Sequence, residues 1–268
     1  MAVRILVCLF LGYLIGTFST GYIVGKVQNI DIRRFGSGNA GTTNALRVLG
    51  RKAGIITFAG DFFKAFIPLT VMKYCIWPDA DFLRLMMLVM GFGIVLGHNF
   101  PFWLNFKGGK GIAATGGVFV AFDPWIFIPG IIIFLGVIFL SKYVSLGSLC
   151  LSVLFPIWMI LTVKGDAYYG WIIFVTCLFT ISAFIRHRAN IVRLANGTEN
   201  PIGRHVDPNV TGASAEAHDG AYATGAAAEA HDGANATESA AEAHDGTNVT
   251  ESLDEVRADS EGAEASDK

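Results

Sequence analysis

The sequence predicts an all-α integral membrane protein with about seven transmembrane helices and a separate acidic C-terminal tail. The first observation behind this prediction is composition: the 268 residues are 53% hydrophobic and only 16% charged, and their mean hydropathy is +0.50. The second is a series of apolar runs, several of them close to the roughly 20 residues that cross a bilayer as a helix. The third is charge segregation, since residues 1–205 hold 18 Lys+Arg and 7 Asp+Glu, whereas residues 206–268 hold 2 and 15. We therefore divide the chain into a membrane domain, residues 1–205, and a tail, residues 206–268.

Seven apolar segments are the candidate spans, and the fourth is unusually short. That segment has 11 residues and is rich in glycine, so we expect it to be a partial crossing buried among the other helices. The first run is longer than a signal peptide requires and is followed by further spans, so we expect it to be retained. In chain order the candidate spans are Ile5–Val24, Ala53–Cys75, Phe82–Leu96, Ile112–Phe122, Trp125–Leu140, Leu149–Val163 and Tyr169–Ile185.

The distribution of basic residues predicts the topology. If the spans alternate in direction, residues 25–52, 97–111, 141–148 and 186–205 share one side of the membrane and hold 13 Lys+Arg. The opposite side holds two, Arg4 and Lys164. The positive-inside rule assigns the basic side to the cytoplasm, which places the N-terminus outside and the tail inside.

The tail contains an internal repeat. The sequence AEAHDG begins at Ala215, Ala228 and Ala241, with a period of 13 residues. The repeats carry no apolar stripe with which they could stack on one another, so we expect the tail to be disordered.

The first polar segment, residues 31–52, has the composition of an anion-binding loop. Glycine allows successive backbone N–H groups to converge on one anion, and a helix that begins near Thr42 or Thr43 would direct its positive end to the same place. The glycines also satisfy the pattern GxGxxG, but a dinucleotide fingerprint requires a strand before it, and here membrane spans flank the loop. The candidate residues of this loop are Gly36, Ser37, Gly38, Asn39, Gly41, Thr43, Asn44 and Arg47.

The second polar segment, residues 97–111, repeats this composition with two lysines among glycines just before a short apolar helix. Two glycine-rich cationic loops suggest two phosphate groups. His98 and Asn99 either contact the ligand or hold the loop in place. The candidate residues of this loop are His98, Asn99, Lys107, Gly108, Gly109, Lys110 and Gly111.

The third polar element combines residues 141–148 with the segment that follows the last span. On a helix, Arg186, Asn190 and Arg193 would share one face, and His187 and Asn190 would be near enough to hold one ligand. A further pair of charges, Asp61 and Lys64, falls inside the second span, where isolated charges are costly, so we expect these two side chains to pair.

Together the three segments resemble those of the bacterial acyl-phosphate:glycerol-3-phosphate acyltransferase family. The matching stretches are GSGNAGTTNALR, GHNFPFWLNFKGGKGIA, and VSLGS with HRANIVRLANGTE, and the likeness covers nearly all of residues 1–205. The resemblance implies a multi-pass enzyme of the bacterial inner membrane that transfers an acyl chain from long-chain acyl phosphate to the 1-hydroxyl of glycerol 3-phosphate. The three motif segments contain only two acidic residues, Asp31 and Glu199, so we expect an enzyme that needs no metal. We also expect it to be monomeric, with no cofactor and no nucleic acid as partner. A transporter for a phosphorylated solute is the alternative function.

The family pattern, carried over position by position, implies nine site residues: Ser37, Thr43, Asn44, Arg47, Lys107, Lys110, Ser148, His187 and Asn190. With the other loop residues named above, we divide the candidates into two groups. His187 could act as a general base or as a binding group, and both roles stay open. The residues assigned to catalysis are Ser37, Arg47, Lys110, Ser148, His187 and Asn190. Those assigned to substrate binding are Gly36, Gly38, Asn39, Gly41, Thr43, Asn44, His98, Asn99, Lys107, Gly108, Gly109 and Gly111.

Overall fold

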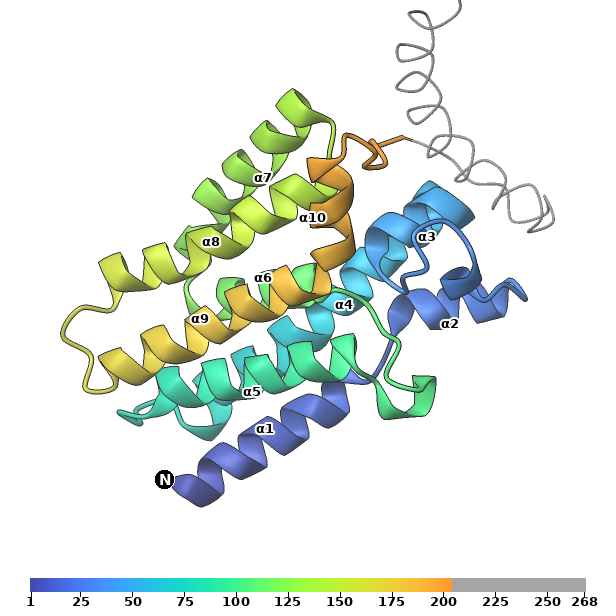
Figure 1. Ribbon diagram of the computed structural model, residues 1–268. Helices are drawn as coiled ribbons and strands as arrows, with labels where there is room; N and C mark the ends of the chain where they lie inside the picture. Colours follow the sequence, from blue (N-terminus) through green and yellow to red (C-terminus); the bar gives the residue numbers. More distant parts are fainter. Residues whose placement is uncertain (204–268) are drawn as a thin grey trace, which may run out of the picture. The chain divides into compact units, whose positions relative to one another are not determined.

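The computed structural model describes residues 1–203, and these residues form helices and connecting turns without strands (Figure 1). The predicted disordered tail with its three AEAHDG repeats, residues 206–268, lies outside the described residues. The prediction of an all-α membrane protein is confirmed for the part of the chain that the structure describes.

Six helical segments within residues 1–203 are long and apolar enough to cross a membrane. Two short helices at the polar end, α3 (Thr42–Leu49) and α10 (Arg188–Ala195), complete the site described below. The spans are α1 (Ala2–Gly16) with α2 (Thr20–Val27), α4 (Arg51–Val71) with a π-helical turn (Met72–Ile76), α5 (Leu83–Asn99), α7 (Phe127–Ser141), α8 (Val144–Thr162) and α9 (Tyr169–Arg186).

One further apolar helix, α6 (Ile112–Phe122), is too short to be counted among these six spans. It corresponds to the short fourth segment expected from the sequence. At 1.5 Å per residue it extends only about 16 Å. It packs against α4 and α5, and Lys73 Nζ donates to the carbonyl oxygens of Ala121 and Phe122 at its C-terminal end. A helix of this length can end inside the bundle because a side chain from α4's π-helical turn pairs the last carbonyl groups.

Glycine pairs allow α1 and α5 to approach closely. A Cβ at Gly12 or Gly16 would lie 2.2 or 2.0 Å from a carbonyl oxygen of α5, and one at Gly93 or Gly97 would lie 2.4 or 2.1 Å from a carbonyl oxygen of α1. Each pair is spaced by four residues, so the two helices present matching grooves of small residues. This packing fixes the second polar segment, which begins in the last turn of α5, against the first span.

The structure departs from the sequence prediction in the first span and at the start of α8. The first span breaks between Gly16 and Thr20, because Thr17 Oγ1 donates to the backbone of α1 and its carbonyl accepts from Trp103 Nε1. The helix α8 begins at Val144 rather than Leu149, so Ser148 lies in a helix and not in a loop.

The predicted common face of Arg186, Asn190 and Arg193 is wrong, since α9 ends at Arg186 and α10 begins at Arg188. His187 separates the two helices: its backbone has φ −99° and ψ 8°, and its ring Nδ1 lies 2.8 Å from the carbonyl oxygen of Ala183. This bond turns the chain, so the Arg186 side chain does not share a helix face with the other two residues.

The four basic segments that the topology places on one side meet at one end of the helices. Arg33 donates to the carbonyl oxygen of Leu104, which joins the first segment to the second. Arg186 donates to the carbonyl oxygens of Gly108 and Gly109, which joins the second to the chain after α9. The backbone of Ile202 donates to Lys142, which brings in the segment between α7 and α8.

Candidate active site

A cavity of about 520 Å³ opens at this end and is polar at one extreme and apolar at the other. The predicted site residues that line it are Ser37, Asn39, Gly41, Thr43, Asn44, Arg47, His98, Lys110, Gly111, Ser148, His187 and Asn190. Polar residues of the lining that were not assigned to the site are Thr42, Asp61, Ser145, Arg193, Glu199 and Asn200. The apolar part is lined by residues of α4, α6, α7 and α8, among them Phe62, Gly116, Phe119, Ile131, Leu135 and Phe155.

The remaining predicted residues lie outside the cavity lining. Three of them, Gly36, Gly38 and Lys107, are exposed to solvent, and both of these glycines have positive φ angles. Sequence spacing did not distinguish residues that shape a loop from residues that face its ligand. The residues outside the lining are Gly36, Gly38, Asn99, Lys107, Gly108 and Gly109.

Asn44 organises the first loop. Its Oδ1 accepts from the backbone N–H of Ser37, and its Nδ2 donates to the carbonyl oxygens of Ile32, Phe35 and Asn39. The side chain is 1% exposed, so these bonds satisfy a buried amide rather than leave it open to a ligand. The helix α3 begins at Thr42, as predicted, and its N-terminal residues line the cavity. Unpaired N–H groups at such a terminus favour an anion.

The second loop is folded onto the ring of His98. A Cβ at Gly109 would lie 1.9 Å from His98 Nε2, and one at Gly108 would lie 2.1 Å from the carbonyl oxygen of His98. Asn99 donates to Ser182 Oγ of α9 and is also buried. These contacts support the loop-holding role for His98 and Asn99, which bring Lys110 into the cavity.

Lys110 is the cation of this loop that reaches the cavity. Its Nζ donates to Asn190 Oδ1, and Arg47, Arg186 and Arg193 are near enough to affect its ionisation. Burial, opposed by Glu199 and reinforced by these arginines, lowers the pKa of Lys110 to about 8. At pH 7 the ammonium form still dominates by roughly ten to one, and the crowding of cations favours a bound anion.

His187 is neutral at physiological pH. Burial, together with the positive charge of Lys110, lowers the pKa of His187 to about 4. A carbonyl oxygen only accepts hydrogen bonds, so the contact with Ala183 requires the proton on Nδ1 and leaves Nε2 as an acceptor. Since His187 lines the cavity, Nε2 is suited to accept a hydrogen bond from a substrate hydroxyl.

Glu199 joins the elements of the third segment, and its role was not predicted. Its Oε1 accepts from Ser145 Oγ and Asn190 Nδ2, and its Oε2 accepts from Arg193 Nε at 2.9 Å. Ser148, by contrast, donates its hydroxyl to Val144 O within α8. Asn190 therefore lies between a carboxylate and the Lys110 ammonium, which fixes the orientation of its amide.

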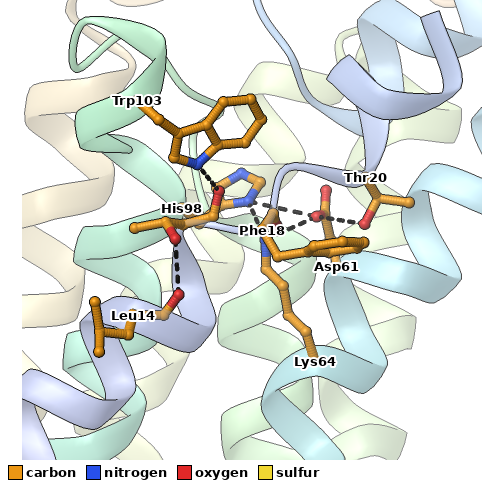
Figure 2. A network of polar contacts seen from close by, with 8 residues as sticks. Leu14, Phe18, Thr20, Asp61, Lys64, His98 and Trp103 are labelled. Carbon is orange, nitrogen blue, oxygen red and sulfur yellow. Dashed lines mark hydrogen bonds and ion pairs between the residues drawn. The ribbon is translucent and has the colours of Figure 1, made fainter. Parts of the chain in front are cut away.

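Asp61 and Lys64 form the expected ion pair, with Nζ and Oδ1 2.9 Å apart, and His98 joins it (Figure 2). Lys64 Nζ also lies 2.8 Å from His98 Nδ1 and donates to the carbonyl oxygen of Phe18 in the break of the first span. Thr20 Oγ1 donates to Asp61 as well. The cluster links α2, α4 and α5 with mutually compensating groups, which is how charges inside a bilayer are tolerated.

Fold and site together define an integral membrane protein with one cavity that is lined by cationic side chains and by apolar residues of the helices. Comparison with known proteins assigns the family. The family described as glycerol-3-phosphate acyltransferase matches residues 6–197, and the chain belongs to it. The chain is 42% identical over 194 residues to the glycerol-3-phosphate acyltransferase of Alkaliphilus metalliredigens, with 72% of this chain and 93% of that protein covered. It is 43% identical over 197 residues to that of Clostridioides difficile, covering 72% and 92%.

Solved structures show the same fold. The chain superposes with a TM-score of 0.66 on the crystal structure of PlsY, an integral membrane glycerol 3-phosphate acyltransferase, in its glycerol 3-phosphate form, at 33% identity. That alignment covers 74% of this chain and 96% of the other. The form of the same enzyme with lysophosphatidic acid gives a TM-score of 0.64 at 32% identity, covering 75% and 96%. These matches favour a membrane acyltransferase over the alternative of a transporter.

Proposed function

We propose that this protein transfers a fatty acyl group from acyl phosphate to the 1-hydroxyl of glycerol 3-phosphate, releasing lysophosphatidic acid and phosphate. The observation that carries the proposal is the single cavity in which Arg47, Lys110 and His187 face a continuous apolar compartment. Both substrates have a phosphate, and the donor also has a long alkyl chain, so the two parts of the cavity match the two parts of the ligands. Relatives with the glycerol 3-phosphate and lysophosphatidic acid forms support the acceptor and the product.

Positioning supplies most of the catalysis in this proposal. The 1-oxygen of glycerol 3-phosphate bonds to the acyl carbonyl carbon, the bond from that carbon to the phosphate oxygen breaks, and the hydroxyl proton passes to phosphate. Arg47 and Lys110 stabilise the charge that grows on the departing phosphate, and Asn190 and His187 orient the acceptor. Holding the hydroxyl against an already activated carbonyl can contribute about 7–11 kcal/mol in favourable cases. No covalent acyl-enzyme is required.

His187 acts as a hydrogen-bond acceptor rather than as the titrating base. We expect His187→Ala to raise the KM for glycerol 3-phosphate and to lower kcat/KM by roughly tenfold, the value of one buried hydrogen bond. Because the pKa of His187 is lowered to about 4, its ionisation should leave no acid limb between pH 5.5 and about 8 in the wild-type rate profile. Steady-state kinetics of the wild type and of His187→Ala between pH 5.5 and about 8 test the loss in kcat/KM and the absence of the acid limb. Complete loss of turnover with unchanged glycerol 3-phosphate binding would contradict the positioning role.

The orientation follows from the charge distribution and is part of the proposal. We infer that the polar end of the cavity and the C-terminal tail face the cytoplasm of a bacterial cell, and that the enzyme acts as a monomer in the inner membrane. The basic segments that meet at this end support the assignment, because cytoplasmic loops are rich in Lys and Arg. Cysteines introduced near residues 40 and 108 should react together with an impermeant thiol reagent from the cytoplasmic side only.

The donor is tested by one comparison. Purified protein in detergent should convert radiolabelled glycerol 3-phosphate to lysophosphatidic acid with palmitoyl phosphate and not with palmitoyl coenzyme A. The Lys110→Met variant controls for a contaminating enzyme. Product formed only from the thioester would overturn the assignment of the donor while leaving the acyltransferase class intact.

A further inference from the structure

Two adjacent glycines of α6 have different surroundings. A Cβ at Gly117 would lie 2.2 Å from the carbonyl oxygen of Phe62, so this glycine is required where α4 and α6 cross. At Gly116 the nearest atoms to an added Cβ are Cδ2 and Cε2 of Phe62, at 3.9 and 4.0 Å, which is ordinary contact. Helix packing therefore explains Gly117 but leaves Gly116 unexplained.

The absence of a side chain at Gly116 has a cost. Glycine inside a helix is roughly 0.5–1 kcal/mol less favourable than alanine, and membrane helices use it mainly where another backbone approaches. No such approach occurs at Gly116, although alanine would fit. The residue instead lines the cavity.

Gly116 lies in the middle of the groove that forms the apolar part of the cavity. Ile112, Gly116 and Val120 line the groove at intervals of four residues, so one stripe of α6 forms its floor. Phe119 and Phe155 close the deep end, where their rings stack with centroids 3.6 Å apart. A chain that runs from the cations along this stripe of α6 passes Gly116.

The sides of the groove open toward the surroundings of the helices. Phe58 of α4 and Ile131 and Leu135 of α7 line the groove and are 49%, 40% and 54% exposed. In a bilayer these apolar side chains face lipid, so an amphiphile can enter between α4 and α7 with its alkyl chain still in an apolar medium.

We propose that Gly116 sets which acyl chains the enzyme accepts, because the space left by its missing side chain is the passage of the alkyl chain from the phosphate-binding end to the deep apolar end. This inference rests on the proposed function and deepens it. A side chain at position 116 would occupy the groove without disturbing the fold. It would exclude chains that extend past the first turn of α6 and leave shorter chains unaffected.

The test compares Gly116→Ala and Gly116→Leu with Gly136→Leu. Gly136 is an exposed residue of α7 that lies outside the cavity lining, with no atom within 4 Å of an added Cβ, so it controls for introducing leucine into an apolar helix. The variants are assayed in nanodiscs with palmitoyl phosphate and with butyryl phosphate. Thermal unfolding of each variant measures the fold separately.

We expect Gly116→Leu to lower kcat/KM for palmitoyl phosphate by at least about tenfold and for butyryl phosphate by less than about threefold, in line with the selectivity of apolar pockets. Gly116→Ala should lose activity with the long donor only, and its Tm should stay unchanged or rise. Gly136→Leu should retain wild-type selectivity. Equal losses with both donors, or no loss with palmitoyl phosphate, would overturn the inference.

A binding measurement with hexadecyl phosphate tests the role of Gly116 independently of the assignment of the donor. Hexadecyl phosphate cannot transfer an acyl group, but it carries the same two recognition elements. It should bind the wild-type protein, seen as inhibition or as a higher Tm. Its affinity for Gly116→Leu should be at least about tenfold lower. If the wild-type protein forms no product from any acyl phosphate, the proposed donor fails. Equal binding of hexadecyl phosphate to both proteins would count against the role of Gly116 in either case.

Discussion

Lys110→Met is expected to lower kcat/KM by about 10²–10³-fold, the range found when one preorganised group that stabilises transition-state charge is removed. The methionine side chain fills a similar volume, so the loss reports the ammonium group rather than a cavity. The variant should fold, because the lysine is not part of the apolar core. Initial rates with saturating donor and varied glycerol 3-phosphate measure the effect. A loss below about threefold would exclude Lys110 from the charge-stabilising role.

The same residue predicts a dependence on pH. The pKa of Lys110 is lowered to about 8, so the cation needed for phosphate is lost as the pH rises through that value. We expect an alkaline limb near pH 8 in kcat/KM of the wild-type enzyme, which reports the free protein. Lys110→Arg should move this limb to higher pH, since a guanidinium stays protonated. A limb that is unchanged in Lys110→Arg would assign the titration to another group.

Lys107→Met is the comparison variant. Lys107 is exposed and lies outside the cavity lining, whereas Lys110 lies within it, although both lysines belong to the same glycine-rich stretch, residues 107–111. The sequence could not separate them, because the direction of each side chain depends on the turn before it. Asn105 and Phe106 have φ angles of 54° and 59°, a conformation that only the folded loop imposes. We expect Lys107→Met to have a much smaller effect than Lys110→Met.

Helix periodicity and loop composition were sufficient for much of the fold. The short α6, the start of α3 at Thr42 and the Asp61–Lys64 pair were all predictable, because hydrophobicity, glycine content and spacing along one helix determine them. The breaks in the first span and at His187 were not, because each depends on side-chain or backbone bonds that local hydropathy does not encode.

The sequence did not predict which side chains that are distant along the chain pair with each other. Asp61 meets His98 from 37 positions away along the chain, and Ser145 meets Glu199 from 54 positions away. A single sequence gives the composition of each polar segment but not the pairing between segments. The sequence therefore could not show that Asn44 hydrogen-bonds within the first loop or that Asn99 donates to Ser182 of α9.

Glu199→Ala is expected to impair both the fold and the reaction. The carboxylate accepts from Ser145, Asn190 and Arg193, and its removal takes this acceptor away from the buried Ser145 and Asn190 and from the partly exposed Arg193. A loss of roughly 3 kcal/mol in stability should follow, measured as a lower Tm in detergent. Activity should fall by at least about tenfold, because Asn190 and Lys110 lose their orientation.

Glu199→Gln separates the charge from the hydrogen bonds. The amide oxygen can still accept from Ser145 or Asn190, so the Tm should lie between those of the wild type and Glu199→Ala. The negative charge of Glu199, however, partly opposes the effect of burial, which lowers the pKa of Lys110 to about 8. Without this charge the pKa of Lys110 should fall below 8. The cation would then disappear at a lower pH, and the alkaline limb of kcat/KM should move below pH 8. If Glu199→Gln lowered the Tm without moving this limb, Glu199 would hold the segment together without tuning Lys110.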